Sequence, residues 1–225
     1  MAFVTIAFVA CGNPDLDGDG LSDTWEAGQS DLSPDRVNLI LIPVLRPGVT
    51  RADVATTLQK VTEFYARVPI LNPDGTTGIY LVVRWGNDLP ASDATTNYWE
   101  ARGRGMPADL IGKGHGVLIA ADRGGGGQTS HSDWAGVSNE WHTIAHELGH
   151  QLGLGHTPRG SAVGSPLYAS IMNYDYTYSF NGSSNAVQFS TGRFESLQLN
   201  EHDLNETLGV ASEHLEFLTQ RPYNY

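Results

Sequence analysis

Three histidines and one glycine near the middle of the chain have the spacing of a catalytic metal site. Residues 146–156 read H-E-L-G-H-Q-L-G-L-G-H, so His146 and His150 would project from one face of a helix. A third ligand six residues later requires the chain to turn back, and Gly153 can adopt the left-handed conformation that ends a helix. His156 would then complete a set of three nitrogen ligands with an open fourth position, which is the arrangement of a catalytic zinc ion.

Glu147 directly follows the first of these histidines. Beside a metal ion, its carboxylate can take a proton from an attacking water and later deliver it to the leaving amine. Its expected role is therefore general base and acid, not ligand. A bare H-E-x-x-H pair recurs by chance on helices that merely pack into a core, but the eleven-residue pattern with glycine at the turn is far more specific.

This motif, together with S-I-M-N-Y at Ser170 to Tyr174, resembles the metzincin clan of zinc metallopeptidases. The resemblance implies an α/β (α+β) fold of two lobes: a twisted mixed sheet with the active-site helix, and a smaller, mainly irregular and helical carboxyl-terminal lobe. It also implies that Met172 forms an apolar floor beneath the zinc. Tyr174 would approach the metal and stabilise an oxyanion, although chance placement among neighbouring tyrosines is the competing interpretation. Thr157 matches no subfamily marker, so the subfamily stays open.

The function that the resemblance implies is that of a secreted zinc metalloendopeptidase. An extended polypeptide substrate would lie along an edge strand, which we expect near His115 to Ala121. Two alternatives come from other classes: a zinc hydrolase of a non-peptide amide, and a non-catalytic calcium-dependent binding module. Glu147 argues against the second, because a purely structural metal site has no use for a general base.

A second candidate metal site lies near the start of the chain, where residues 15–26 read D-L-D-G-D-G-L-S-D-T-W-E. Oxygen side chains fall at loop positions one, three, five, nine and twelve, with glycine at position six, which is the arrangement that wraps a calcium ion. The expected calcium ligands are the carboxylates of Asp15, Asp17, Asp19, Asp23 and Glu26 and the carbonyl of Leu21. The loop resembles those of thrombospondin type 3 repeats or dockerins, and its expected work is to fix the amino-terminal segment on the domain. A solvated acidic linker is the alternative.

Cys11 is the only cysteine, so an internal disulfide is excluded. The preceding F-V-A resembles a lipoprotein cleavage box, which would make Cys11 a lipid anchor on the cell surface. An inert cysteine is the second interpretation. The third is a switch resembling that of matrixin pro-segments, because residues 11–15 read C-G-N-P-D.

The net charge and the composition limit the classes of partner that the chain could bind. The formal net charge of −12 argues against a nucleic-acid partner, because phosphate binding relies on a surplus of Lys and Arg. Apolar residues make up 40% of the chain, and no apolar run approaches the ~20 residues of a membrane span. We expect a monomer that acts on polypeptides.

Alternating strands and helices are predicted to position the zinc motif. We expect strands at residues 37–45, 79–85 and 115–121, a helix capped by Thr50 and Asp53, and an extended piece within residues 128–137 that leads into the motif helix. The expected domains are a signal or anchor remnant or first strand (1–14), the calcium loop (15–26) and the catalytic domain (37–225). Its upper lobe would span residues 37–155 and its lower lobe residues 156–225.

Overall fold

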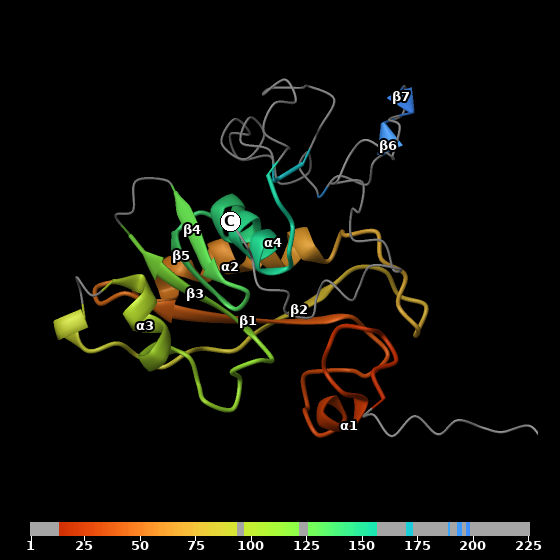
Figure 1. Cartoon of the computed structure of the whole chain (residues 1–225), viewed down its shortest axis with the longest axis horizontal. Helices are drawn as coiled ribbons and strands as arrows, with labels where there is room; N and C mark the ends of the chain where they lie inside the picture. Colours follow the sequence, from red (N-terminus) through yellow and green to blue (C-terminus); the bar gives the residue numbers. More distant parts are fainter. Residues whose placement is uncertain are drawn as a thin grey trace, which may run out of the picture.

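A five-stranded mixed sheet is the centre of the fold in the computed structural model (Figure 1). The structure describes residues 14–93, 97–121, 126–156, 170–172 and 189, and the backbone of residues 193–194 and 197–198. The strand order is β2-β1-β3-β5-β4. The strands are β1 (Asn38–Leu45), β2 (Tyr80–Val83), β3 (His115–Ala120), β4 (Gly127–His131) and β5 (Trp134–Ser138). All neighbours are parallel except the β4–β5 pair, which is antiparallel. The predicted mixed α/β fold is therefore confirmed.

Helix α2 (Arg51–Tyr65) begins where the sequence predicts. The Thr50 side chain accepts a hydrogen bond from the Asp53 backbone N–H, and the Asp53 carboxylate accepts from the Thr50 backbone N–H. This reciprocal pair satisfies two of the free donors at the start of the helix. The helix connects β1 to the parallel strand β2, which completes the predicted strand–helix–strand unit.

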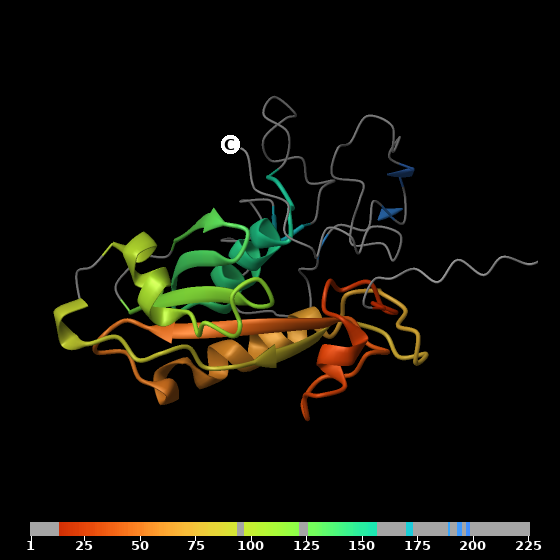
Figure 2. The ribbon, with the colours of Figure 1, turned by 60° about the horizontal axis from the view of Figure 1, so that its bottom comes forward.

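Strand β1 is apolar on both faces because both faces are covered. Leu39 and Leu41 belong to the core beneath α2 and the motif helix α4 (Trp141–Gln151), whereas Ile40 and Ile42 belong to a second core beneath α3 (Tyr98–Gly105). Side chains alternate between the faces of a strand, so a continuous apolar run is what such a buried strand requires. Figure 2 shows α2 and α3 on opposite sides of β1.

The position of β3 corrects one expectation. Strand β3 pairs with β1 on one side and with β5 on the other, so it is a central strand and has no free edge for a substrate. Within the described part of the chain, the strand next to α4 with only one partner is β4. Strand order depends on contacts that are distant in sequence, which the local pattern of residues 115–121 does not contain.

Four smaller elements complete the description. Helix α1 (Asp23–Glu26) ends the acidic loop, a 3₁₀ turn covers Ala91–Asp93, and β6 (Arg193–Phe194) pairs with β7 (Leu197–Gln198). Most of the expected lower lobe (residues 156–225) lies outside the described residues. Residues 1–13 lie outside them as well. Among the described helices, none has the length and apolar character to cross a membrane.

Candidate metal centre and active site

Helix α4 brings the three predicted zinc ligands together. The Nε2 atom of His156 lies 3.0 Å from Nε2 of His146 and 2.9 Å from Nε2 of His150. His146 and His150 are buried on α4, and His156 returns from the turn after it. The three rings thus present one nitrogen each to a common point, and these atoms all lie within 4.8 Å of one another.

Hydrogen bonds on the far side of two rings set which nitrogen faces that point. The Nδ1 atom of His146 lies 2.8 Å from the carbonyl of Ile171, and Nδ1 of His150 lies 2.8 Å from the carbonyl of Leu154. A carbonyl only accepts, so each Nδ1 carries the proton and each Nε2 presents a lone pair. Lone pairs that converge on one point repel one another unless a cation lies between them. The donor set therefore fits a zinc ion.

Burial also favours neutral rings. Desolvation lowers the pKa of His146 to about 4 and that of His150 to about 3, and it lowers the pKa of His156. Near neutral pH all three imidazoles are consequently uncharged, which is the form that binds a metal ion.

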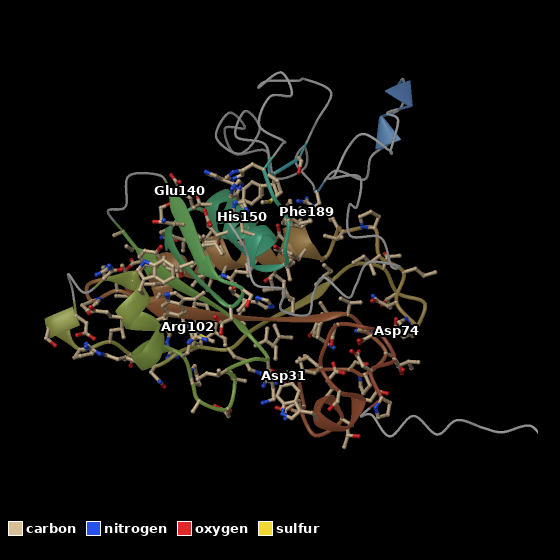
Figure 3. The ribbon with its side chains drawn as sticks, in the orientation of Figure 1. Asp31, Asp74, Arg102, Glu140, His150 and Phe189 are labelled. Carbon is tan, nitrogen blue, oxygen red and sulfur yellow. The ribbon has the colours of Figure 1, made fainter. Side chains whose placement is uncertain are left out.

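Glu147 lies beside the triad on the same helix. Its side chain is buried, and its Oε2 accepts a hydrogen bond of 2.7 Å from the Thr129 hydroxyl of β4. An acidic side chain is seldom buried without a cation or donors, and the Thr129 hydroxyl is one such donor. Figure 3 places His150 on α4, behind β4.

Gly153 makes the turn that returns His156 to the helix. Its φ of 90° is in the left-handed region, its N–H donates to the carbonyl of His150, and the Leu154 N–H donates to the carbonyl of Gly149. This pair of bonds is a Schellman motif. The same turn aims the Leu154 carbonyl at His150, so one glycine supports two of the three rings.

Gly153→Ala is expected to lower the free energy of unfolding by about 1–2 kcal/mol, because a Cβ is disfavoured in a left-handed conformation. Zinc affinity should fall as well, since the return of His156 would be distorted. Gly103→Ala is the matched control: that glycine lies in α3, a Cβ added there would meet open space, and alanine favours a helix. Thermal unfolding and zinc titration of both variants check this, and equal behaviour would contradict the assigned role of Gly153.

The segment predicted to form a methionine turn lies directly against α4. Met172 is buried, and a Cβ added at Gly149 would come within 2.6 Å of its sulfur. The Met172 N–H donates to the Ser170 hydroxyl, and the carbonyl of the intervening Ile171 is the acceptor for His146. The expected apolar floor is thus in contact with the helix that carries two of the histidines. Tyr174 lies outside the described residues, and so does Cys11.

The acidic loop forms a second cluster at the start of β1. Asp15, Asp17 and Asp19 offer oxygens that lie within 4.8 Å of one another. Glu26 joins this cluster through β1, because Asn38 donates from its side chain to Glu26 Oε1 (2.5 Å) and from its backbone to Asp19 Oδ2 (2.7 Å).

Two oxygens of this cluster are buried without a hydrogen-bond donor among the described residues: Oδ2 of Asp17 and Oε2 of Glu26. Burial, together with the neighbouring carboxylates, raises the pKa of each of these carboxyls to about 8. Burial likewise raises the pKa of Asp19, to about 6. Buried, mutually repelling carboxylates are the surroundings that a calcium ion would stabilise.

Two of the predicted calcium ligands have other contacts in the loop. Asp23 begins α1, and its Oδ1 accepts from the Leu16 N–H at 2.8 Å. Leu21 inserts its side chain into the core beneath α3, and its N–H donates to Asp19 Oδ1. The loop is therefore attached to the sheet by an apolar anchor as well as by Asn38.

Several residues around the histidine site have no signal in the sequence. Thr129 and the carbonyls of Ile171 and Leu154 reach the site through tertiary contacts. Gln151 binds His115 and the carbonyl of Gly116, which fixes the end of α4 against β3. A backbone carbonyl is present in every residue, so residue type does not reveal which carbonyl binds a histidine. The contact between Thr129 and Glu147 depends on how the β4–β5 hairpin packs against α4.

The histidine triad on α4, the glycine turn and the methionine beneath the helix are similar to the zinc site of metzincin-type metallopeptidases, of open subfamily. One family comparison agrees with this similarity. Residues 94–190, which contain the triad, Glu147 and Met172, match the family Reprolysin_5, described as metallo-peptidase family M12.

A partly similar solved structure is the crystal structure of metalloproteinase-II from Bacteroides fragilis. It has 19% sequence identity and a TM-score of 0.34, over 53% of this chain and 43% of that chain. This chain thus spans less than half the length of that protein. No curated protein sequence matches the chain.

Proposed function

We propose that this protein is a zinc-dependent endopeptidase that hydrolyses polypeptides. The observation that carries the proposal is the convergence of three imidazole nitrogens beside a buried carboxylate, that of Glu147. The match to a metallopeptidase family over residues 94–190 supports the same class. A site used only to stabilise the fold would require the three histidines but not Glu147.

The chemistry divides between the metal and the chain. A zinc ion at the triad would supply Lewis-acid polarisation of the scissile carbonyl and would acidify the attacking water. Glu147 removes the proton from that water and returns it to the departing amine. Its burial limits the access of bulk water, which would otherwise weaken the electrostatic effect of the carboxylate.

The substrate is proposed to lie along β4. This strand pairs only with β5 among the described strands, and it packs beside α4, which carries Glu147. A polypeptide in extended conformation can add to such an edge through backbone hydrogen bonds, which suits substrates of varied sequence. This edge replaces the one expected near His115.

Two histidines of the same region provide the test. His156→Ala is expected to weaken zinc binding by more than the ~10- to 100-fold typical of losing an outer hydrogen-bond partner, because a direct ligand is lost. His142→Ala is the matched control, since His142 lies one turn before His146 but outside the triad and contacts Glu140 instead. Zinc content and cleavage of casein are measured for both variants. Zinc binding and cleavage by His156→Ala at the level of His142→Ala would reject the proposal.

We also propose that residues 15–26 hold a structural calcium ion. The support is the pair of buried oxygens without donors among the described residues, on Asp17 and Glu26, within a cluster that already raises the pKa of both groups. Asp15, Asp19, Asp23 and the Leu21 carbonyl complete the proposed ligand set. Loops of this kind bind calcium at concentrations found outside cells, so we propose a secreted or cell-surface location.

A further inference from the structure

Two residues of β4 face the side chain of Glu147. Gly127 and Thr129 are two apart on the strand, so they share a face, and that face is turned toward α4. The β4–β5 pairing holds both in place, with Gly127 opposite Val137 and Thr129 opposite Ala135.

Thr129 supplies a hydrogen-bond donor to the carboxylate. Its hydroxyl lies 2.7 Å from Glu147 Oε2 and 3.0 Å from the backbone carbonyl of the same residue. A hydroxyl has one proton, and the shorter contact to the charged oxygen is the stronger bond. Thr129 is only 2% exposed, so water has little access to replace this donor.

Gly127 supplies the space that the carboxylate occupies. A Cβ at this position would lie 2.5 Å from both Cγ and Oε1 of Glu147. The carboxylate is therefore confined between a strand position that has no side chain and the Thr129 hydroxyl.

We infer that Thr129 is a positioning residue that holds the Glu147 carboxylate in its reactive orientation over Gly127. The inference rests on the proposed peptidase function. A glutamate side chain has three rotatable torsions, and a proton acceptor works only within hydrogen-bond reach of its target. Loss of the Thr129 hydroxyl removes this constraint on the carboxylate without removing the base.

The test compares Thr129→Val, which keeps the shape and loses the hydroxyl, with Thr129→Ser, which keeps the hydroxyl. In the zinc-loaded full chain, Thr129→Val is expected to lower kcat about 10- to 100-fold, the rate equivalent of one hydrogen bond to a charged group, with KM and zinc content unchanged. Thr129→Ser should restore kcat to within about threefold of wild type. Thr62→Val is the matched control, because it makes the same substitution in α2, where the Thr62 hydroxyl donates to the Leu58 carbonyl.

A second measurement does not depend on activity. In the zinc-free protein, NMR couplings of the Glu147 side chain should report one rotamer in wild type and Thr129→Ser, and averaged rotamers in Thr129→Val. Unchanged kcat and an unchanged rotamer in Thr129→Val would overturn the inference, as would equal losses in the valine and serine variants. If wild type cleaves no peptide, the proposed function fails, while the rotamers still decide whether Thr129 orients Glu147.

Discussion

Glu147→Gln is expected to lower kcat/KM for peptide hydrolysis by about 10²- to 10⁴-fold, the range that a positioned general base contributes. The amide has nearly the shape of the carboxylate and can still accept the Thr129 hydrogen bond, but it cannot take a proton from water. The three imidazoles are untouched, so zinc content should remain that of the wild type. This combination of lost activity and retained metal separates a catalytic role from a structural one.

Glu140→Gln is the matched control for that substitution. Glu140 is the N-cap residue of α4, and its Oε2 lies 3.5 Å from Nε2 of His142. The substitution therefore removes a negative charge at the start of the same helix and leaves the three histidines of the triad in place. Initial rates on a fluorogenic peptide, with zinc measured in the same samples, decide the outcome. Cleavage by Glu147→Gln at the wild-type rate would mean that another group activates the water.

Calcium is expected to raise the melting temperature by about 5–10 °C when its concentration exceeds the dissociation constant about 100-fold. Binding to the folded state alone contributes ~2.7 kcal/mol at that ratio, and each kcal/mol shifts the melting temperature of a chain of this size by ~2–4 °C. The physical reason is that the ion would stabilise the ionised carboxylates of Asp17, Asp19 and Glu26, which repel one another and take up protons when no cation is bound. Differential scanning calorimetry with calcium and with a chelator measures the shift.

The calcium effect should also increase with pH. In the folded, calcium-free protein the pKa of Asp17 and that of Glu26 are each raised to about 8, above their ordinary values of 3.8 and 4.5. In their protonated form these two groups stabilise the folded state. This stabilisation is fully present at pH below their pKa in the unfolded chain, and it is lost as the pH rises through about 8, their pKa in the folded chain. A bound cation takes the place of the protons, so we expect a larger calcium-induced shift near pH 8 than near pH 5.

Asp17→Asn and Asp35→Asn distinguish this site from general screening of negative charge. Asp17 is buried in the cluster, whereas Asp35 is exposed and outside it. The calcium-induced shift should shrink strongly in Asp17→Asn and persist in Asp35→Asn. Equal shifts in the two variants would show that calcium acts on the overall charge rather than at this loop.

The features predicted correctly from sequence are those specified by neighbouring residues. The Thr50–Asp53 capping box marks the start of α2, and the run at residues 38–45 forms a strand buried on both faces. Gly153 has the expected positive φ because the third histidine requires a turn that only glycine makes without strain. Each of these signals lies within a few residues of the element it specifies.

The features that sequence does not predict depend on long-range contacts. Whether β3 lies at an edge or in the centre of the sheet depends on its pairing with β1 and β5, and its own apolar residues suit either place. Thr129 contacts Glu147 only because the β4–β5 hairpin packs beside α4. In the sequence Asn38 is an ordinary first residue of a strand, yet it connects Asp19 and Glu26 of the acidic loop to β1.

The most direct test of the central claim is zinc reconstitution of the metal-stripped full chain. Cleavage of a peptide library is followed by mass spectrometry as zinc is added. We predict that the stripped protein is inactive and that cleavage rises with zinc until the one site formed by His146, His150 and His156 is filled. Zinc-saturated protein that cleaves no peptide, or stripped protein that cleaves as well as the zinc-loaded form, would contradict the claim.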